Sequence, residues 1–378
     1  MAIFIIHNIK DRCLIDMNLR KEQLKFSKIE VAKLLKTLMA VLPEETYQKT
    51  KSYLMEVCID SNEESINSAI NGLSEEDEFA LMSLLMGTSV NLVPLEQRPI
   101  IKGEYIVPDF LASFQINNNL IQSEYNQYLK CFIDVKSTDK DKYKIGGSEL
   151  QRRRNFAKQF DLPLLFAVRF TQFPRFPCWV LMEDNDYSKS SLTISFTDIM
   201  NGGREKIWND YWFLISTKKV LFKAEFTQDY SILQSSKYGN LQKFDIIING
   251  YVISFTDINK ATVLYILFEQ MTEEIVSIEQ GRSIIQTLVP RFDMRCIADV
   301  LYHFNKLGRD NRDYPSPAPK LLLHADKIGK NFTIKREFIE GIIQQLIKAK
   351  ILNLFIPSKG FHISKVDHQD WQEIVVNI

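Results

Sequence analysis

Between residues 75 and 183 the spacing of apolar residues changes from a helical period to a strand period, then back, then to strands again. This order constrains the fold more than any other feature. The helical run EFALMSLLM precedes three strand candidates, and a basic helix, GSELQRRRNFAKQF, separates these from two more. The five strand candidates lie at 90–100, 105–116, 128–137, 162–170 and 178–183. The order predicts an α/β domain of about 110 residues, a normal domain size.

The residues before this domain have mainly helical patterns. VAKLLKTLMAVL and PEETYQKTKSYLMEV have helical apolar spacing, so residues 1–73 are predicted to be a mainly helical region. Its opening, MAIFIIHNIK, is typical of a short strand. A further helix is expected to begin at Ser74, where SEED has the form of a capping box, and to end at Gly87.

The residues after the domain divide into two regions. Residues 191–260 are rich in strand patterns and either extend the sheet or form a small β subdomain. Residues 261–378 are predicted to be helical, with a proline-rich linker at 311–320. They end in a helix near 334–350 and two short strands around PSKG, the helix and hairpin of a winged-helix-like module. The basic residues expected to contact phosphates or an acidic partner from this module are Lys335, Arg336 and Lys359.

Composition excludes several classes of protein. Lys plus Arg and Asp plus Glu each number 47, so any nucleic-acid-binding surface must be local. The five cysteines are scattered without a C-x-x-C pair, which excludes a cysteine-rich zinc module and argues against a disulfide framework. No apolar run approaches the roughly 20 residues of a membrane span. The chain is therefore expected to be cytoplasmic, with no membrane partner.

The strand CFIDVKST carries two opposite charges on one face. Asp134 and Lys136 are two positions apart and therefore point the same way, while Ile133 and Val135 point into a core. Asp109 lies near the start of the preceding strand candidate, and adjacent antiparallel strands can bring it about 5 Å from Asp134 between Cα atoms. Two carboxylates this close repel each other unless a proton or a divalent cation neutralises them. Mg²⁺ prefers such oxygen ligands. The alternative is a solvated ion pair on an edge strand.

The order Glu78…Pro108-Asp109…Asp134-x-Lys136 resembles the motif of the PD-(D/E)XK nuclease superfamily, over residues 75–185. VNLVPLEQRPIIKGEYIVPDFLA is similar to the segment before the metal site in endonuclease subunits of heteromeric transposases. ELQRRRNFAKQFDLPLLFAVRF is similar to the helix and strand after the motif in archaeal Holliday-junction resolvases and related defence nucleases.

The resemblance implies an α/β, restriction-endonuclease-like mixed sheet flanked by helices at residues 74–190. It also implies that Asp109, Asp134 and the weaker match Glu78 bind Mg²⁺ or Mn²⁺ and act with Lys136, the catalytic lysine. Lys136 would position or deprotonate the attacking water and stabilise the charge that builds on phosphorus. Many relatives have Glu where this chain has Asp134, and the motif allows either.

The helix after the motif is rich in basic residues. A cluster of positive charge on one helix strengthens phosphate binding, although a run of charges is also typical of a solvated face. The residues expected to bind nucleic acid are Arg152, Arg153, Arg154 and Lys158.

These observations predict a Mg²⁺-dependent endonuclease that hydrolyses phosphodiester bonds of DNA, in a mobile-element or anti-phage defence setting. Its partners would be DNA, further subunits of such a complex, or a second copy of the chain. Two alternatives stay open. In the first alternative, the chain is a non-catalytic nucleic-acid-binding adaptor on a nuclease fold. In the second, it is an RNA nuclease.

Overall fold

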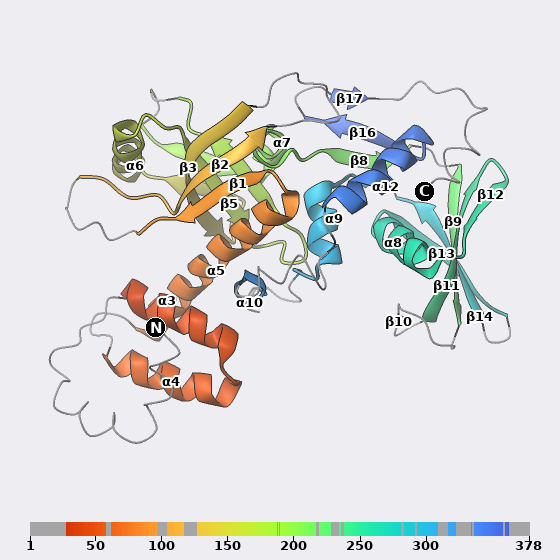
Figure 1. The fold of residues 1–378 in the computed structure, drawn as a ribbon, viewed down its shortest axis with the longest axis horizontal. Helices are drawn as coiled ribbons and strands as arrows, with labels where there is room; N and C mark the ends of the chain where they lie inside the picture. Colours follow the sequence, from red (N-terminus) through yellow and green to blue (C-terminus); the bar gives the residue numbers. More distant parts are fainter. Residues whose placement is uncertain are drawn as a thin grey trace. The chain divides into compact units, whose positions relative to one another are not determined.

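The structure is a computed structural model. It describes residues 28–57, 62–96, 104–116, 127–186, 188, 190–216, 219–227, 234–235, 238–280, 283–291, 293–308, 317–322, 334, 336–357 and 360–362. The chain divides into two compact units (Figure 1). The first comprises Met1–Leu81 with Asp313–Ile328, and the second comprises Met82–Arg312 with Gly329–Ile378. The expected opening strand and much of the expected linker lie outside the described residues.

The first unit is helical, as its sequence predicts. Its helices pack their apolar stripes together, because residues three and four apart share one face of a helix. Its core contains Val31, Leu35, Tyr47, Ile66 and Ile70. The helices are α3 (Lys28–Val41), α4 (Glu44–Val57), most of α5 (Glu63–Met86) and α10 (Ala318–Leu322), which contacts α3.

The predicted start of a helix at Ser74 is wrong. Ser74 lies in the middle of α5, and its hydroxyl donates to the Ile70 carbonyl oxygen at 2.9 Å. A serine that bonds back to the preceding turn does not cap a helix, and the apolar stripe runs through this position. The predicted end is confirmed. Gly87 follows Met86 with a φ of 70°, the left-handed conformation that favours glycine after a helix.

The second unit contains the expected mixed sheet flanked by helices, which confirms an α/β fold. The strand order is β1-β2-β3-β5-β6, in which only β3 and β5 run parallel (Figure 1). The crossover between these two strands contains α6 (Gly147–Gln159). The strands are β1 (Ser89–Pro94), β2 (Phe110–Ile116), β3 (Gln127–Thr138), β5 (Leu164–Phe170) and β6 (Trp179–Glu183).

The core of this sheet explains why the crossover helix lies against it. Leu150 and Ala157 of α6 pack with Phe132 of β3 and with Phe166 and Val168 of β5. All seven residues of β5 are buried, as expected for a central strand with both faces covered. The helix α7 (Gly203–Trp208) contacts β2 and β6. A Cβ on Gly203 would lie 1.7 Å from the Leu181 carbonyl oxygen, so only glycine fits there.

The strand-rich region does not extend this sheet. It contributes to three further sheets, with some strands drawn from beyond residue 260. The short strands β4 (Lys142–Ile145) and β7 (Leu192–Ser195) pair, and the 3₁₀ helix η2 (Phe196–Met200) follows. A six-stranded antiparallel sheet contains β9 (Val220–Thr227), β10 (Gln234–Ser235), β11 (Gly239–Ile248), β12 (Tyr251–Phe255), β13 (Thr272–Gln280) and β14 (Ser283–Pro290).

The expectation of a helical region from residue 261 onward is therefore wrong in part. The helix α8 (Ile258–Glu269) is present and packs on the six-stranded sheet, where Phe268 stacks on Phe222 with ring centroids 4.3 Å apart. The next two elements, β13 and β14, are strands that pair with each other, and β14 also pairs with β9. Because β9 lies more than 50 residues earlier in sequence, the pairing of β14 with β9 depends on tertiary structure and not on the local spacing of apolar residues.

The expected C-terminal helix and hairpin are present as α12 (Arg336–Lys348), β16 (Leu352–Ile356) and β17 (Gly360–His362). The strand β16 also pairs with β8 (Trp212–Ile215), which pairs with β15 (Arg295–Cys296). The helix α9 (Ile297–Phe304) contacts α12. A winged-helix identity for this module stays a prediction. None of the described helices is long and apolar enough to cross a membrane.

Candidate active site

Pairing of β2 with β3 places Asp109 and Asp134 opposite each other. The register pairs Phe110 with Ile133, so the next positions on the two strands are Asp109 and Asp134. Asp109 directly precedes β2, and its backbone N–H donates to the Ile133 carbonyl oxygen at 2.9 Å, which continues the ladder by one bond. Both carboxylates are buried, with 5% and 1% of the residue exposed.

Lys136 lies between the two carboxylates. Its Nζ is 3.0 Å from Asp134 Oδ2 and 3.7 Å from Asp109 Oδ2, and it donates to the Val135 carbonyl oxygen at 2.9 Å. Asp109 Oδ2 also accepts a 2.6 Å hydrogen bond from the Val135 backbone N–H, which holds its carboxylate in place. The structure therefore brings together Asp109, Asp134 and Lys136.

Arg153 is part of the same cluster. Its Nε lies 2.7 Å from Asp134 Oδ2, and its Nη1 lies 2.8 Å from Glu149 Oε1. The contact with Asp134 is an ion pair whose N–H direction falls outside hydrogen-bond geometry, so Asp134 Oδ2 is a buried acceptor without an aligned donor. Sequence reasoning assigned Arg153 to a DNA-binding face. The periodic neighbours Leu150 and Ala157 were the signal that this position faces the sheet.

The basic helix α6 divides its charges between two faces. Arg154 is also buried, and it binds Asp184 through two hydrogen bonds of 2.6 and 2.7 Å. Arg153 and Arg154 are thus committed to ion pairs within the protein and do not project into solvent. The side chains of Arg152 and Lys158 are exposed, and neither makes an ion pair with a residue that the structure describes. Phosphate binding by α6 stays a prediction that now rests on these two residues.

The charges of the cluster shift its pKa values. Burial raises the pKa of Asp109 to about 6, against the opposing effect of the Lys136 ammonium, and the charge of Asp134 adds to the rise. Burial alone would lower the pKa of Lys136, but the carboxylates of Asp134 and Asp109 outweigh it and raise that pKa. Lys136 is therefore a charged ammonium beside two acids.

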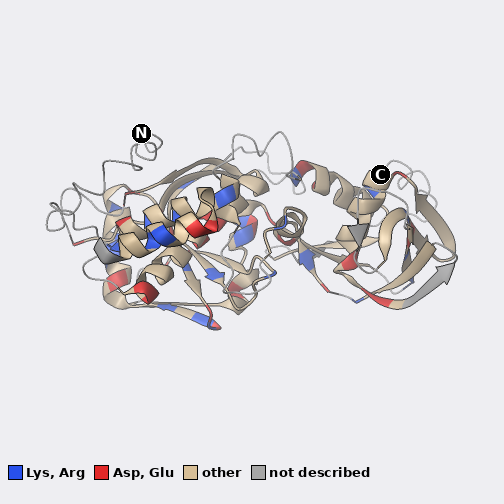
Figure 2. Ribbon diagram, turned by 90° about the horizontal axis from the view of Figure 1, so that it is seen from below, with Lys and Arg blue, Asp and Glu red and all other residues tan. Residues whose placement is uncertain are grey.

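Elsewhere on the described ribbon, basic and acidic residues are interspersed (Figure 2).

The donor set fits a magnesium-type ion held by two carboxylates. Within the part of the chain that the structure describes, no group of three or more His, Cys, Asp and Glu residues could hold a metal ion. Mg²⁺ does not need one, because it is commonly bound through one or two carboxylates, with waters and substrate phosphates as its other ligands. Asp134 Oδ2 is buried and has two ion-pair partners but no hydrogen bond among the described residues, so its lone pairs can also serve such a cation.

Glu78 is buried in α5 and is assigned to the first unit, whereas Asp109 and Asp134 are assigned to the second. Its role as a metal ligand stays a prediction.

Comparisons with known proteins do not identify a family for this chain. No protein-family model matches the chain, and no curated protein matches it. The structure is similar to that of Hjc, a Holliday junction resolvase from the archaeal hyperthermophile Archaeoglobus fulgidus, at 15% identity and a TM-score of 0.23. The match covers 34% of this chain and 86% of the resolvase. A TM-score this low does not establish a shared fold, so the function must be argued from the site.

Proposed function

We propose that the protein is a metal-dependent nuclease that hydrolyses phosphodiester bonds of DNA. One observation carries the proposal: two buried carboxylates on adjacent strands share a lysine at 3.0 and 3.7 Å. Burying two acids side by side costs free energy unless cations compensate them. Binding of Mg²⁺ or Mn²⁺ by the carboxylates, and of a phosphate beside the lysine, would be a function that accounts for this arrangement.

The mixed sheet supports the same proposal. Asp109 comes just before β2 and Asp134 with Lys136 lies on β3, and α6 then crosses over to the parallel strand β5. This is the order that the PD-(D/E)XK superfamily motif requires, so within this proposal we retain the restriction-endonuclease-like fold predicted for residues 74–190.

Each residue has a role that follows from its contacts. Asp109, oriented by the Val135 N–H, and Asp134, steadied by Arg153, would hold the metal ion through carboxylate oxygens. The ion, when bound, supplies Lewis-acid stabilisation of the phosphoryl oxygens and lowers the pKa of water. Lys136 presents its ammonium at the same place, where it can orient the attacking water and stabilise the negative charge that develops on the phosphate.

The non-catalytic alternative uses the same geometry differently. Arg153 and Lys136 together balance the two carboxylates, so the cluster also satisfies itself as a structural ion-pair network on an adaptor protein. An RNA nuclease is the second alternative, because a two-carboxylate site does not select DNA. Binding of further subunits, self-association and a defence or transposition setting stay predictions.

Cleavage assays separate these possibilities. Full-length protein is incubated with supercoiled plasmid, linear duplex and a structured RNA of similar length, in MgCl₂, in MnCl₂ and in EDTA. We expect nicking or cutting of DNA with either metal and none in EDTA. Undiminished cleavage in EDTA would contradict the carboxylate–metal mechanism, and preferential cleavage of RNA would favour the RNA nuclease. No cleavage of any substrate, with metal binding also absent, would support the adaptor.

A further inference from the structure

A cavity of about 700 Å³ lies in the second unit and shares no residue with the Asp109–Asp134 site. Four separate segments line it: the β5–β6 connection, Gln270 at the end of α8, the residues around β15 with the start of α9, and the end of α9 with the turn after it. Its volume falls within the range of about 300–1,000 Å³ that is usual for small-molecule sites. A cavity of this size admits a nucleotide-sized molecule.

The lining carries an excess of positive charge. Four cationic side chains face two carboxylates there: Arg175, Arg291, Arg295 and Lys306 against Asp293 and Asp299. The chain as a whole has a net charge of zero, so this excess is local. Arg291 is paired with Asp293, to which its Nε donates at 2.9 Å. The side chains of Arg175 and Lys306 are exposed, and they form no ion pair within the described part of the chain.

Arg295 is the buried cation of the cavity. Only 7% of it is exposed, yet its ion pair with Asp299, from Nε to Oδ2, is long at 3.8 Å. Its guanidinium makes no hydrogen bond to a side chain or carbonyl of the residues that the structure describes. It lies 5.3 Å from the centroid of the Phe176 ring, a cation–π distance. A guanidinium whose donors face a cavity and are not used within the described protein is well suited to a bidentate contact with a phosphate.

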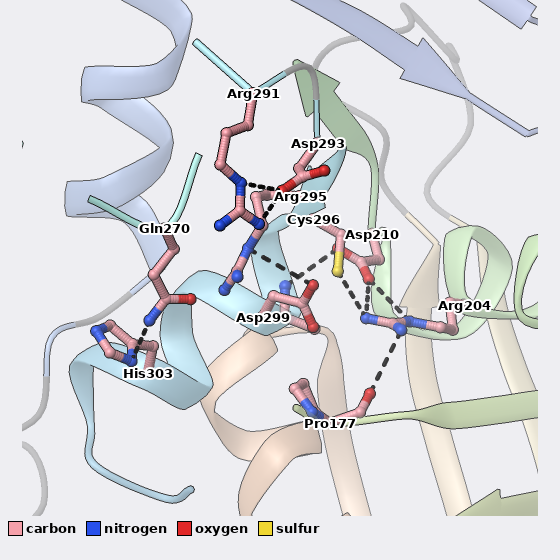
Figure 3. A network of polar contacts seen from close by, with 11 residues as sticks. Pro177, Arg204, Asp210, Gln270, Arg291, Asp293, Arg295, Cys296, Asp299 and His303 are labelled. Carbon is pink, nitrogen blue, oxygen red and sulfur yellow. Dashed lines mark hydrogen bonds and ion pairs between the residues drawn. The ribbon is translucent and has the colours of Figure 1, made fainter. Parts of the chain in front are cut away.

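The walls of the cavity are held by other buried contacts, so its shape is built into the fold. Arg204 is fully enclosed and binds Asp210, the Cys296 sulfur and the Pro177 carbonyl oxygen, which ties β15 to the β5–β6 connection (Figure 3). Tyr302 of α9 donates from its hydroxyl to the Pro174 carbonyl oxygen at 3.5 Å, in the same connection.

A neutral donor and an aromatic ring complete the lining. The Gln270 amide nitrogen lies 2.6 Å from His303 Nδ1 (Figure 3). Burial and then the charge of Arg295 lower the pKa of His303, which keeps the ring neutral. Phe176 remains 44% exposed although Arg295 covers one face of its ring, which leaves aromatic surface for a planar group.

We propose that this cavity binds a nucleoside phosphate. The phosphates would contact Arg295, Arg175 and Lys306, and the base would pack against Phe176. Nucleobases stack on aromatic side chains, and arginine is the favoured bidentate partner of phosphate. This inference does not depend on the nuclease proposal.

Calorimetric titration of the full-length protein tests the proposal. ADP, GDP, inorganic phosphate, adenosine and a single-stranded oligonucleotide are each titrated in the presence of EDTA, which prevents metal-bridged binding at the carboxylates. We expect ADP or GDP to bind more tightly than inorganic phosphate and at least tenfold more tightly than adenosine. Absence of ADP and GDP binding at millimolar concentration overturns the proposal. So does binding of the oligonucleotide alone, which would make the cavity part of a nucleic-acid surface.

Variants locate the binding. Arg175→Ala with Lys306→Ala removes two exposed cations and should lower nucleotide affinity tenfold or more, because these side chains no longer donate charge-assisted hydrogen bonds to phosphate. Lys260→Ala with Lys348→Ala removes the same charge from exposed positions that do not line the cavity, and it should change affinity less than twofold. Phe176→Ala should weaken nucleotides at least fivefold and leave inorganic phosphate unchanged. Equal decreases in the two double variants would place the ligand elsewhere, and an unchanged nucleotide affinity in Phe176→Ala would refute the stacked base.

Discussion

At the scale of single residues, the charged cluster on β2 and β3 follows directly from strand geometry. Alternation along β3 puts Asp134 and Lys136 on one face, and the β2–β3 register puts Asp109 opposite them. Arg153 could not be placed in the same way, because its interaction with Asp134 depends on how α6 packs on the sheet. The result is a cluster in which two cations balance two carboxylates.

The buried ion pair between Arg153 and Asp134 should be important for stability. Arg153→Ala leaves a buried carboxylate with less compensation, and we expect the free energy of unfolding to fall by about 3 kcal/mol. Arg152→Ala, its exposed neighbour on the same helix, is the matched control and should change stability by no more than about 0.5 kcal/mol. Urea denaturation followed by circular dichroism measures both. A similar small effect for the two variants would mean that Arg153 contributes little to the cluster.

At the scale of secondary-structure elements, the spacing of apolar residues predicts the helices and strands whose formation depends on neighbouring residues in the sequence. The strands between residues 90 and 183 were recognisable because their β-branched and aromatic runs are bounded by turn residues, and α6 because of its helical spacing. The start of α5 was misplaced because a serine followed by acids also occurs inside helices, where its hydroxyl bonds back to the preceding turn. The strands β13 and β14 were missed because their partner β9 is remote in sequence.

The exposed face of α6 should control binding of nucleic acid if it follows the phosphate backbone. Replacing Arg152 and Lys158 by Ala should make the slope of log affinity against log salt shallower by about 0.9 for each phosphate that is no longer neutralised. Affinity should fall equally for unrelated DNA sequences, since binding to phosphates carries no sequence information. Fluorescence anisotropy with labelled duplexes across a salt series measures the slope. An unchanged slope would mean that these charges only solvate the helix.

At the scale of the whole molecule, Arg336 joins segments that are far apart in sequence. The sequence suggested that it contacts phosphates or an acidic partner, but it is buried and donates to the carbonyl oxygens of Met86, Trp208 and Asn209. It also pairs with Glu340. The expectation that Arg336 contacts a partner is therefore wrong, because its side chain holds segments of this protein together. The other two basic residues named with it, Lys335 and Lys359, lie outside the described residues.

Removal of the Arg336 side chain should destabilise the second unit. Arg336→Ala leaves three backbone carbonyl oxygens without their charged donor, and we expect the free energy of unfolding to fall by about 3 kcal/mol. Lys348→Ala, at the exposed end of the same helix, should change it by no more than about 0.5 kcal/mol. Thermal unfolding of the two variants beside the parent gives the comparison. Equal melting temperatures in all three proteins would show that α12 does not depend on this residue.

The central claim is that Asp109, Asp134 and Lys136 form a metal-dependent catalytic site. Its most direct test is single-turnover DNA cleavage in MnCl₂ by Lys136→Ala and by Lys130→Ala, an exposed lysine of the same strand. Calorimetric Mn²⁺ titration of each variant and of Asp134→Asn accompanies the rates. We expect the rate of Lys136→Ala to fall at least about 100-fold while Mn²⁺ binding is retained, and Asp134→Asn to lose both. We also expect Lys130→Ala to match the parent. Cleavage by Lys136→Ala at the parent rate, or Mn²⁺ binding that survives unchanged in Asp134→Asn, would contradict the account.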